Sequence, residues 1–270
     1  MEEQKKPDAE IQSAKEIVVN TVILYFRNLP KLLIAEGVLG VAFVLGFLYM
    51  SWGRISLFWG FGIRNHYLIY LEGYLLLFIY FHLFAYTATM LIYYVNETAG
   101  GRRLSIRDIY GSGNPRLSRK VTIRLFLLVV IIVPIEYVIN IALDIAGFDG
   151  GIISLGDIIL LIVPAILVQL LPMWVLEDKG LVKSLISLIN IPRLIVARNA
   201  IIILIFMALN SVSPVCVVKF MDYSVDAFFL ASSALSLVLA PLIAIAIVLT
   251  YRDSLARNSA GQRMDEAETM

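Results

Sequence analysis

The chain has 270 residues with a net charge of +1; 60% of them are hydrophobic and 16% are charged. Soluble domains average about 45–50% apolar and about 25% charged residues, so this composition excludes a soluble globular enzyme, a disordered chain and a fibrous protein. It predicts an integral membrane protein. The balanced charge gives no sign of a nucleic-acid partner. One cysteine and two histidines indicate no metal cluster, so we expect no metal and no cofactor.

Six apolar runs are each long enough to cross a bilayer core of about 30 Å as a helix. They cover residues 32–52, 67–95, 125–147, 152–176, 199–221 and 226–251. Helices are expected because lipid offers no hydrogen bonds to an open backbone. The longest stretch between runs, 96–124, is too short for a soluble catalytic domain. The predicted fold class is therefore an all-α integral membrane protein, one polytopic domain of six transmembrane helices over residues 1–270.

The basic residues predict the orientation of these spans. With six spans, 19 of the 22 lysines and arginines fall on the side that holds both chain ends, and 3 fall on the other side. Cytoplasmic loops carry the excess of basic residues in multi-pass proteins. We therefore expect a protein of the cell membrane with its N- and C-termini in the cytoplasm.

Amphipathic segments precede the first, third and fifth spans. Residues 9–30 place apolar side chains along one stripe and predict a helix that lies in the membrane interface and ends at Pro30. Residues 181–198 repeat this pattern. Residues 104–124 are the weakest copy: Ser105 and Asp108 predict a helix start, and the GSGNP sequence at 111–115 interrupts it. The pattern favours three units, each an interfacial helix and two spans, over the alternative that any helix ahead of a span looks this way.

The segment PMWVLEDKGLVKSLISLINIPRLIVARN (172–199), together with ILYFRNLPKLL (23–33) and VLTYRDSLAR (248–257), resembles a known family. It is similar to the membrane domain associated with some glycerophosphodiester phosphodiesterases and to the YciC-like six-span membrane proteins. The resemblance implies the six-span fold. It does not imply phosphodiesterase activity, because that activity belongs to a neighbouring catalytic domain for which this chain has no room.

Ionisable residues within spans are candidate functional groups because their insertion costs about 2.5–3.5 kcal/mol at the bilayer centre. Glu136 and Asn140 share one face of the third span, and His82 is expected at a similar depth in the second. Asp157 lies in the fourth span. We interpret Glu136, Asn140, His82 and Asp157 as a candidate intramembrane polar site. Glu36 lies near a span end and is expected to contact water.

A second candidate site is the basic loop between the second and third spans. Its cations could contact anionic lipid headgroups, or they could serve only to set the topology. They are Arg102, Arg103, Arg107, Arg119 and Lys120.

Three functions follow from these features. The first is a non-enzymatic helical bundle that interacts with membrane lipids or with a partner membrane protein. The second is a small transporter or channel that uses Glu136 and His82. The third, an intramembrane lipid enzyme, lacks a catalytic constellation in the sequence, so we expect no enzymatic activity.

Overall fold

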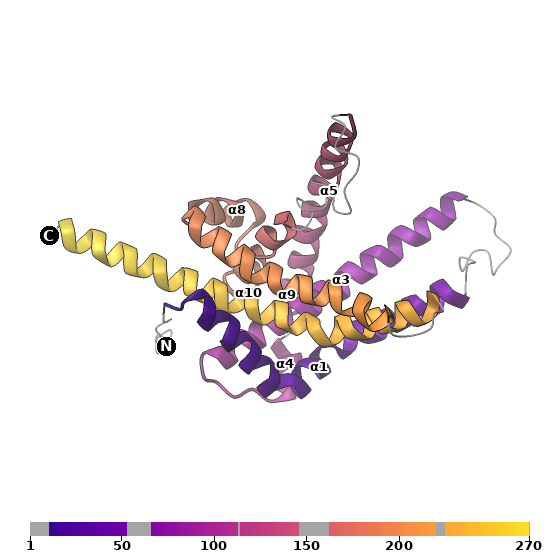
Figure 1. Cartoon of the computed structure of the whole chain (residues 1–270), viewed down its shortest axis with the longest axis horizontal. Helices are drawn as coiled ribbons and strands as arrows, with labels where there is room; N and C mark the ends of the chain where they lie inside the picture. The colour runs from indigo at the N-terminus through magenta and orange to yellow at the C-terminus, as the bar shows by residue number, and fades with distance from the viewer. Residues whose placement is uncertain (1–10, 53–65, 113, 146–161, 220–224, 270) are drawn as a thin grey trace.

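The computed structural model describes residues 11–52, 66–112, 114–145, 162–219 and 225–269 (Figure 1). Every regular element in these ranges is a helix, which confirms the predicted all-α class. The helices are α1 (Ala14–Trp52), α3 (His66–Ala99), α4 (Ile106–Ser112), α5 (Pro115–Ile145), α7 (Leu170–Leu176), α8 (Leu181–Asn190), α9 (Arg193–Lys219) and α10 (Val225–Thr269). Residues 162–167 are helical as well.

Three stretches of the described chain are long and apolar enough to cross a membrane. They are Ala14–Gly37 in α1, Arg193–Asn210 in α9 and Leu237–Ala260 in α10. The structure therefore fits the predicted membrane protein. The predicted run 67–95 also lies wholly within α3, whereas 152–161, the first part of the predicted fourth span, lies outside the described residues.

The first helix corrects one expectation. The predicted interfacial helix does not end at Pro30, because α1 continues through this proline to Trp52. A proline inside a helix removes one backbone hydrogen bond and crowds the carbonyl four residues earlier. Here Tyr25 before the proline and Leu32 after it are both buried in the same hydrophobic core. Packing on both sides of Pro30 thus holds the two halves of α1 in one helix.

The other two amphipathic segments are each divided into two helices. The start predicted at Ser105 is confirmed: the Asp108 N–H donates to the Ser105 hydroxyl at 3.2 Å, and the Ser105 N–H donates to the Asp108 carboxylate at 2.9 Å. This reciprocal pair caps α4. The interruption at 111–115 is confirmed too, since α5 begins at Pro115. In the third segment, Pro192 separates α8 from α9, so the predicted helix 181–198 is not continuous.

The long C-terminal helix organises the packing. It contacts α1, α3, α7 and α9, and Figure 1 shows it running through the whole molecule. The main core lies between these helices, and Trp174 of α7 is its largest fully buried side chain. Gly40 allows a close approach of α1 to α10, because a Cβ at this position would lie 3.1 Å from Leu237 Cδ1. By contrast, the second half of α5 extends away from the other helices in Figure 1.

A buried carboxylate joins the N-terminal segment to α9 and α10. Asp253 is 1% exposed and accepts hydrogen bonds from the Arg198 guanidinium, from Arg257 Nε at 2.8 Å and from the Gln12 N–H at 2.7 Å. Next to it, the Asn199 side-chain amide donates to the Ser254 hydroxyl at 2.9 Å. Asp253 is therefore the counter-charge of two arginines that come from two different helices.

The basic residues that border the apolar part of each long helix bond to neighbouring segments. Lys31 Nζ of α1 donates to the Leu104 carbonyl at 2.7 Å. Arg252 of α10 donates to the Asn96 carbonyl at 2.9 Å. We call Lys31, Arg198 and Arg252, together with these bonds, the polar layer.

Replacing Asp253 with alanine should destabilise the protein by about 2–3 kcal/mol, because two partly buried guanidiniums lose their carboxylate. The measurement is unfolding of the purified protein by SDS titration, followed by circular dichroism. Asp108→Ala serves as control, since Asp108 is exposed and caps only one short helix. Equal losses in the two variants would contradict the proposed importance of Asp253.

Candidate functional site

Of the four residues of the predicted intramembrane site, the structure describes only the side chain of His82. His82 Nδ1 lies 3.1 Å from the Thr122 hydroxyl, which itself donates to the Ser118 carbonyl at 2.9 Å. Because the hydroxyl has one proton and it is already donated, Nδ1 must be the donor to Thr122. This hydrogen bond therefore links α3 to the N-terminal part of α5.

Glu136 lies on the same helix, fourteen residues after Thr122. At a rise of 1.5 Å per residue, this is about 21 Å along the axis of α5. The contact of His82 with α5 is therefore about 21 Å along the helix from Glu136. Asn140 follows Glu136 on α5 by one further turn. The side chains of Glu136 and Asn140, and the whole of Asp157, lie outside the described residues.

A different acid occupies the interior of the bundle. Glu36 of α1 is 3% exposed, and its Oε2 atom has no hydrogen-bond partner among the described residues. The expectation that Glu36 contacts water at a span end is wrong. Its position in the sequence could not reveal this, because burial comes from helices packed against α1. The available signal was that Glu36 is the one acid within 32–52.

Two of the five basic loop residues form ion pairs within the protein, and all five are exposed. Lys120 forms an ion pair with Asp178, whose other oxygen accepts a bond from Arg124 at 3.1 Å. Arg102 pairs with Glu97 at 3.1 Å. Arg103, Arg107 and Arg119 are exposed. Of the five predicted lipid contacts, Lys120 and Arg102 therefore already have carboxylate partners within the protein.

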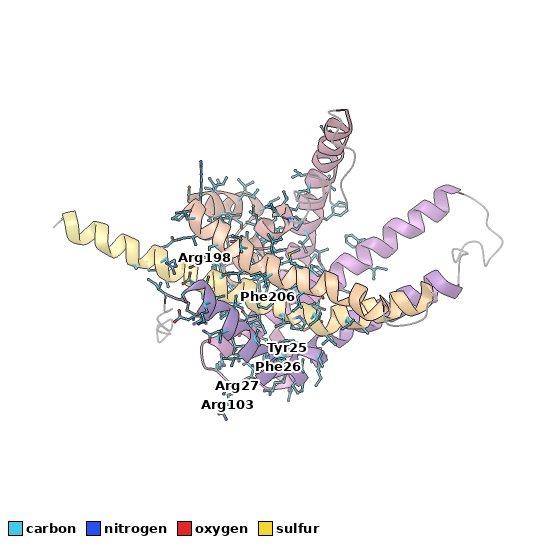
Figure 2. The ribbon with its side chains drawn as sticks, viewed as in Figure 1. Tyr25, Phe26, Arg27, Arg103, Arg198 and Phe206 are labelled. Atoms are coloured by element: carbon cyan, nitrogen blue, oxygen red, sulfur yellow. The ribbon has the colours of Figure 1, made fainter. Side chains whose placement is uncertain are left out.

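Two hydrogen bonds hold the chain around α4 against α1. One is the Lys31–Leu104 bond, and the other runs from the Tyr110 hydroxyl to the Ile34 carbonyl at 2.6 Å. Arg27 lies one helical turn before Lys31, and Figure 2 shows Arg27 and Arg103 at the same edge of the molecule. We call the exposed arginines Arg27, Arg103 and Arg107 the α1–α4 cationic face.

Apolar side chains border this cationic face. Ile23 and Phe26, on the turn of α1 that leads to Arg27, are 54% and 67% exposed. Figure 2 places Phe26 next to Arg27. Exposed aromatic and aliphatic side chains beside arginines are typical of a surface that sits at the boundary between acyl chains and headgroups.

The described interior offers little space for a larger ligand. A cavity of about 10 Å³ is lined by Gln169, Asn199, Thr250 and Ser254 with apolar neighbours. This is roughly the space that one water molecule needs. A second cavity of similar size lies between α1, α3 and α10. No group of His, Cys, Asp and Glu among the described residues could hold a metal ion.

Comparison with family models, with curated proteins and with solved structures finds no match to this chain. The resemblance to the YciC-like membrane proteins therefore stays a prediction from the sequence.

The Asp178 ion pairs should make the stability of the folded protein depend on pH in the acid range. Hydrogen bonds from Lys120 and then Arg124 hold the pKa of Asp178 below its ordinary value. The stabilisation is complete above the ordinary aspartate pKa of about 3.9 and is lost as the pH falls through the lowered value.

The measurement is the thermal unfolding midpoint in detergent between about pH 7 and about pH 2, compared with Asp178→Asn. The difference between the two proteins should be present at neutral pH and shrink at the acid end. A difference that is constant over the whole range would contradict this account.

Proposed function

We propose that this protein is a non-enzymatic, multi-pass protein of the cell membrane that binds anionic lipid headgroups through the α1–α4 cationic face. The observation that carries the proposal is that the exposed Arg27 and Arg103 lie at one edge of the molecule (Figure 2), where α1 also exposes apolar side chains. The exposed Arg107 follows Arg103 by four residues. Each basic residue near an anionic surface contributes about 1 kcal/mol. An exposed Phe26 adds apolar contact with the acyl chains just below the headgroups.

The position of the cations along α1 supports this placement. The helix has 39 residues, about 58 Å at 1.5 Å per residue, so it is longer than the bilayer core of about 30 Å. Hydropathy alone selects Ala14–Gly37 as a candidate span. That window would place Arg27 and Lys31 in the hydrocarbon. We therefore place the span in the second half of α1, over 32–52, with Arg27 at the headgroups.

We further propose six spans in three units, with both termini in the cytoplasm. A short motif supports the repeat: asparagine and proline followed by a basic residue and leucine occur in NLPKL (28–32), NPRL (114–117) and NIPRL (190–194). Each proline lies within or at the start of α1, α5 and α9, the helices that carry the first, third and fifth proposed spans. Proline suits the first turn of a helix.

The alternative functions have less support. A transporter or channel that uses His82 together with Glu136 requires the two groups to meet, and His82 instead bonds to Thr122. A partner membrane protein on the same face would bury the arginines against carboxylates rather than phosphates. We prefer lipid because the exposed apolar residues lie beside the cations along one helix.

The topology predicts that tags at both chain ends react from the cytoplasmic side, because the basic residues concentrate on that side. A tag near residue 149 should react only from the outside. The measurement is labelling of intact and permeabilised cells with an impermeant reagent. Tags at the two ends found on opposite sides would refute an even number of spans.

The lipid proposal predicts that replacing Arg27, Arg103 and Arg107 together with glutamine weakens binding of an anionic lipid about 10- to 100-fold, through the loss of three headgroup contacts. Phosphatidylglycerol retention by the purified protein, followed by native mass spectrometry, measures this.

A matched control replaces Lys15, Lys183 and Arg116, which are also exposed and remove the same charge. Binding should be largely kept in the control. An equal loss in both variants would mean that only overall charge matters, and unchanged binding in the first variant would refute the site.

A further inference from the structure

The strongest unexplained feature outside the cationic face is the pair Glu36 and Thr87. Both side chains are buried, at 3% and 2% exposure. Glu36 Oε2 and the Thr87 hydroxyl each lack a hydrogen-bond partner among the described residues. Buried polar atoms without partners are rare in native proteins and need a physical reason.

The two residues come to the same level of the bundle. Between α1 and α3, the Tyr94 hydroxyl of α3 donates to Asn28 Oδ1 of α1 at 2.8 Å. Figure 1 shows α1 and α3 running in opposite directions, with α1 ending on the side of the molecule where α3 begins. The helices are therefore antiparallel. Glu36 lies about two turns after Asn28 on α1. Thr87 lies about two turns before Tyr94 on α3.

The Thr87 hydroxyl differs from the other buried threonine hydroxyls because it makes no hydrogen bond within its own helix. Four other buried threonines donate their hydroxyl to the carbonyl four residues earlier in the same helix, namely Thr21, Thr89, Thr122 and Thr250. Thr87 makes no such bond. Since seven residues are close to two helical turns, Thr87 also lies on the face of α3 that carries Tyr94 toward α1.

The groups around Glu36 offer no positive charge. On α1 itself, the Tyr25 hydroxyl donates to the Val238 carbonyl of α10 at 2.8 Å. From α4, Tyr110 donates to the Ile34 carbonyl. The nearest lysine along α1, Lys31, is bonded to Leu104. Neighbouring α10 residues 237–242 are apolar or proline. An ionised, unpaired carboxylate in such a place is strongly disfavoured.

We propose that Glu36 is a proton-binding site inside the bundle, held as a neutral carboxylic acid at neutral pH, with the unbonded Thr87 hydroxyl at the same level on α3. The ligand is a proton because one carboxyl and one hydroxyl supply too few oxygens for a metal cation, which takes six or more. This site is separate from the cationic face and does not depend on lipid binding.

Infrared spectroscopy of the full-length protein in lipid vesicles at about pH 7 tests the proposal, since an ordinary glutamate, with a pKa of about 4.3, is ionised there. The difference spectrum between the wild type and Glu36→Gln should contain the carbonyl stretch of a neutral carboxylic acid. Carboxylate bands in its place would overturn the proposal. Glu97→Gln is the control, because Glu97 pairs with Arg102 and should give carboxylate bands.

Labelling gives an independent measurement. A hydrophobic carbodiimide reacts with neutral carboxylic acids in apolar surroundings: the carboxyl oxygen adds to the central carbon and its proton moves to nitrogen, with no leaving group. Mass spectrometry should find the adduct on the peptide containing Glu36, and Glu36→Gln should abolish it. Absence of the adduct from that peptide in the wild type would overturn the proposal.

Discussion

The arrangement of the whole bundle depends on keeping charge out of the hydrocarbon, and Asp253 is the group on which this constraint acts most directly. Its carboxylate neutralises Arg198 of α9 and Arg257 of α10 and also fixes Gln12 ahead of α1. Three parts of the chain, far apart in sequence, therefore meet at one buried acid. Below that level, α9 carries no charged side chain between Arg198 and Lys219, as a helix surrounded by lipid requires.

The same constraint explains why the arginines of the cationic face are available to bind an anion. Several basic residues have partners within the protein: Lys31 and Arg252 bond to carbonyls, and Lys120 and Arg124 share Asp178. The arginines of the cationic face have exposed guanidiniums and apolar neighbours instead. A bundle that pairs its structural cations internally leaves a distinct set for an outside anion, which is the basis of the lipid proposal.

The sequence was sufficient for the fold class and for several helix ends. Composition and run length gave the all-α membrane class, and Ser105 with Asp108 marked the start of α4 because a capping pair is a local interaction. Local rules failed where packing decides: Pro30 does not end α1, since core contacts flank it. Likewise, the position of Glu36 in the sequence predicts a wet boundary, but the packed structure buries it.

The surroundings of His82 show a second limit of the sequence. Counting residues into an apolar run predicts a depth within that run but not the contacts of a side chain with the next helix. In the structure α3 and α5 each extend beyond their apolar runs, to Ala99 and from Pro115. His82 therefore pairs with Thr122 near the start of α5, a relation that span counting alone could not give.

The length of α10 has a mechanical consequence. The helix continues sixteen residues past Asp253 to Thr269, about 24 Å at 1.5 Å per residue. Since Asp253 fixes it to α9 and to the N-terminal segment, the helix can act as a lever with its fulcrum at this acid. A tilt of about 10° there would displace the far tip by about 4 Å.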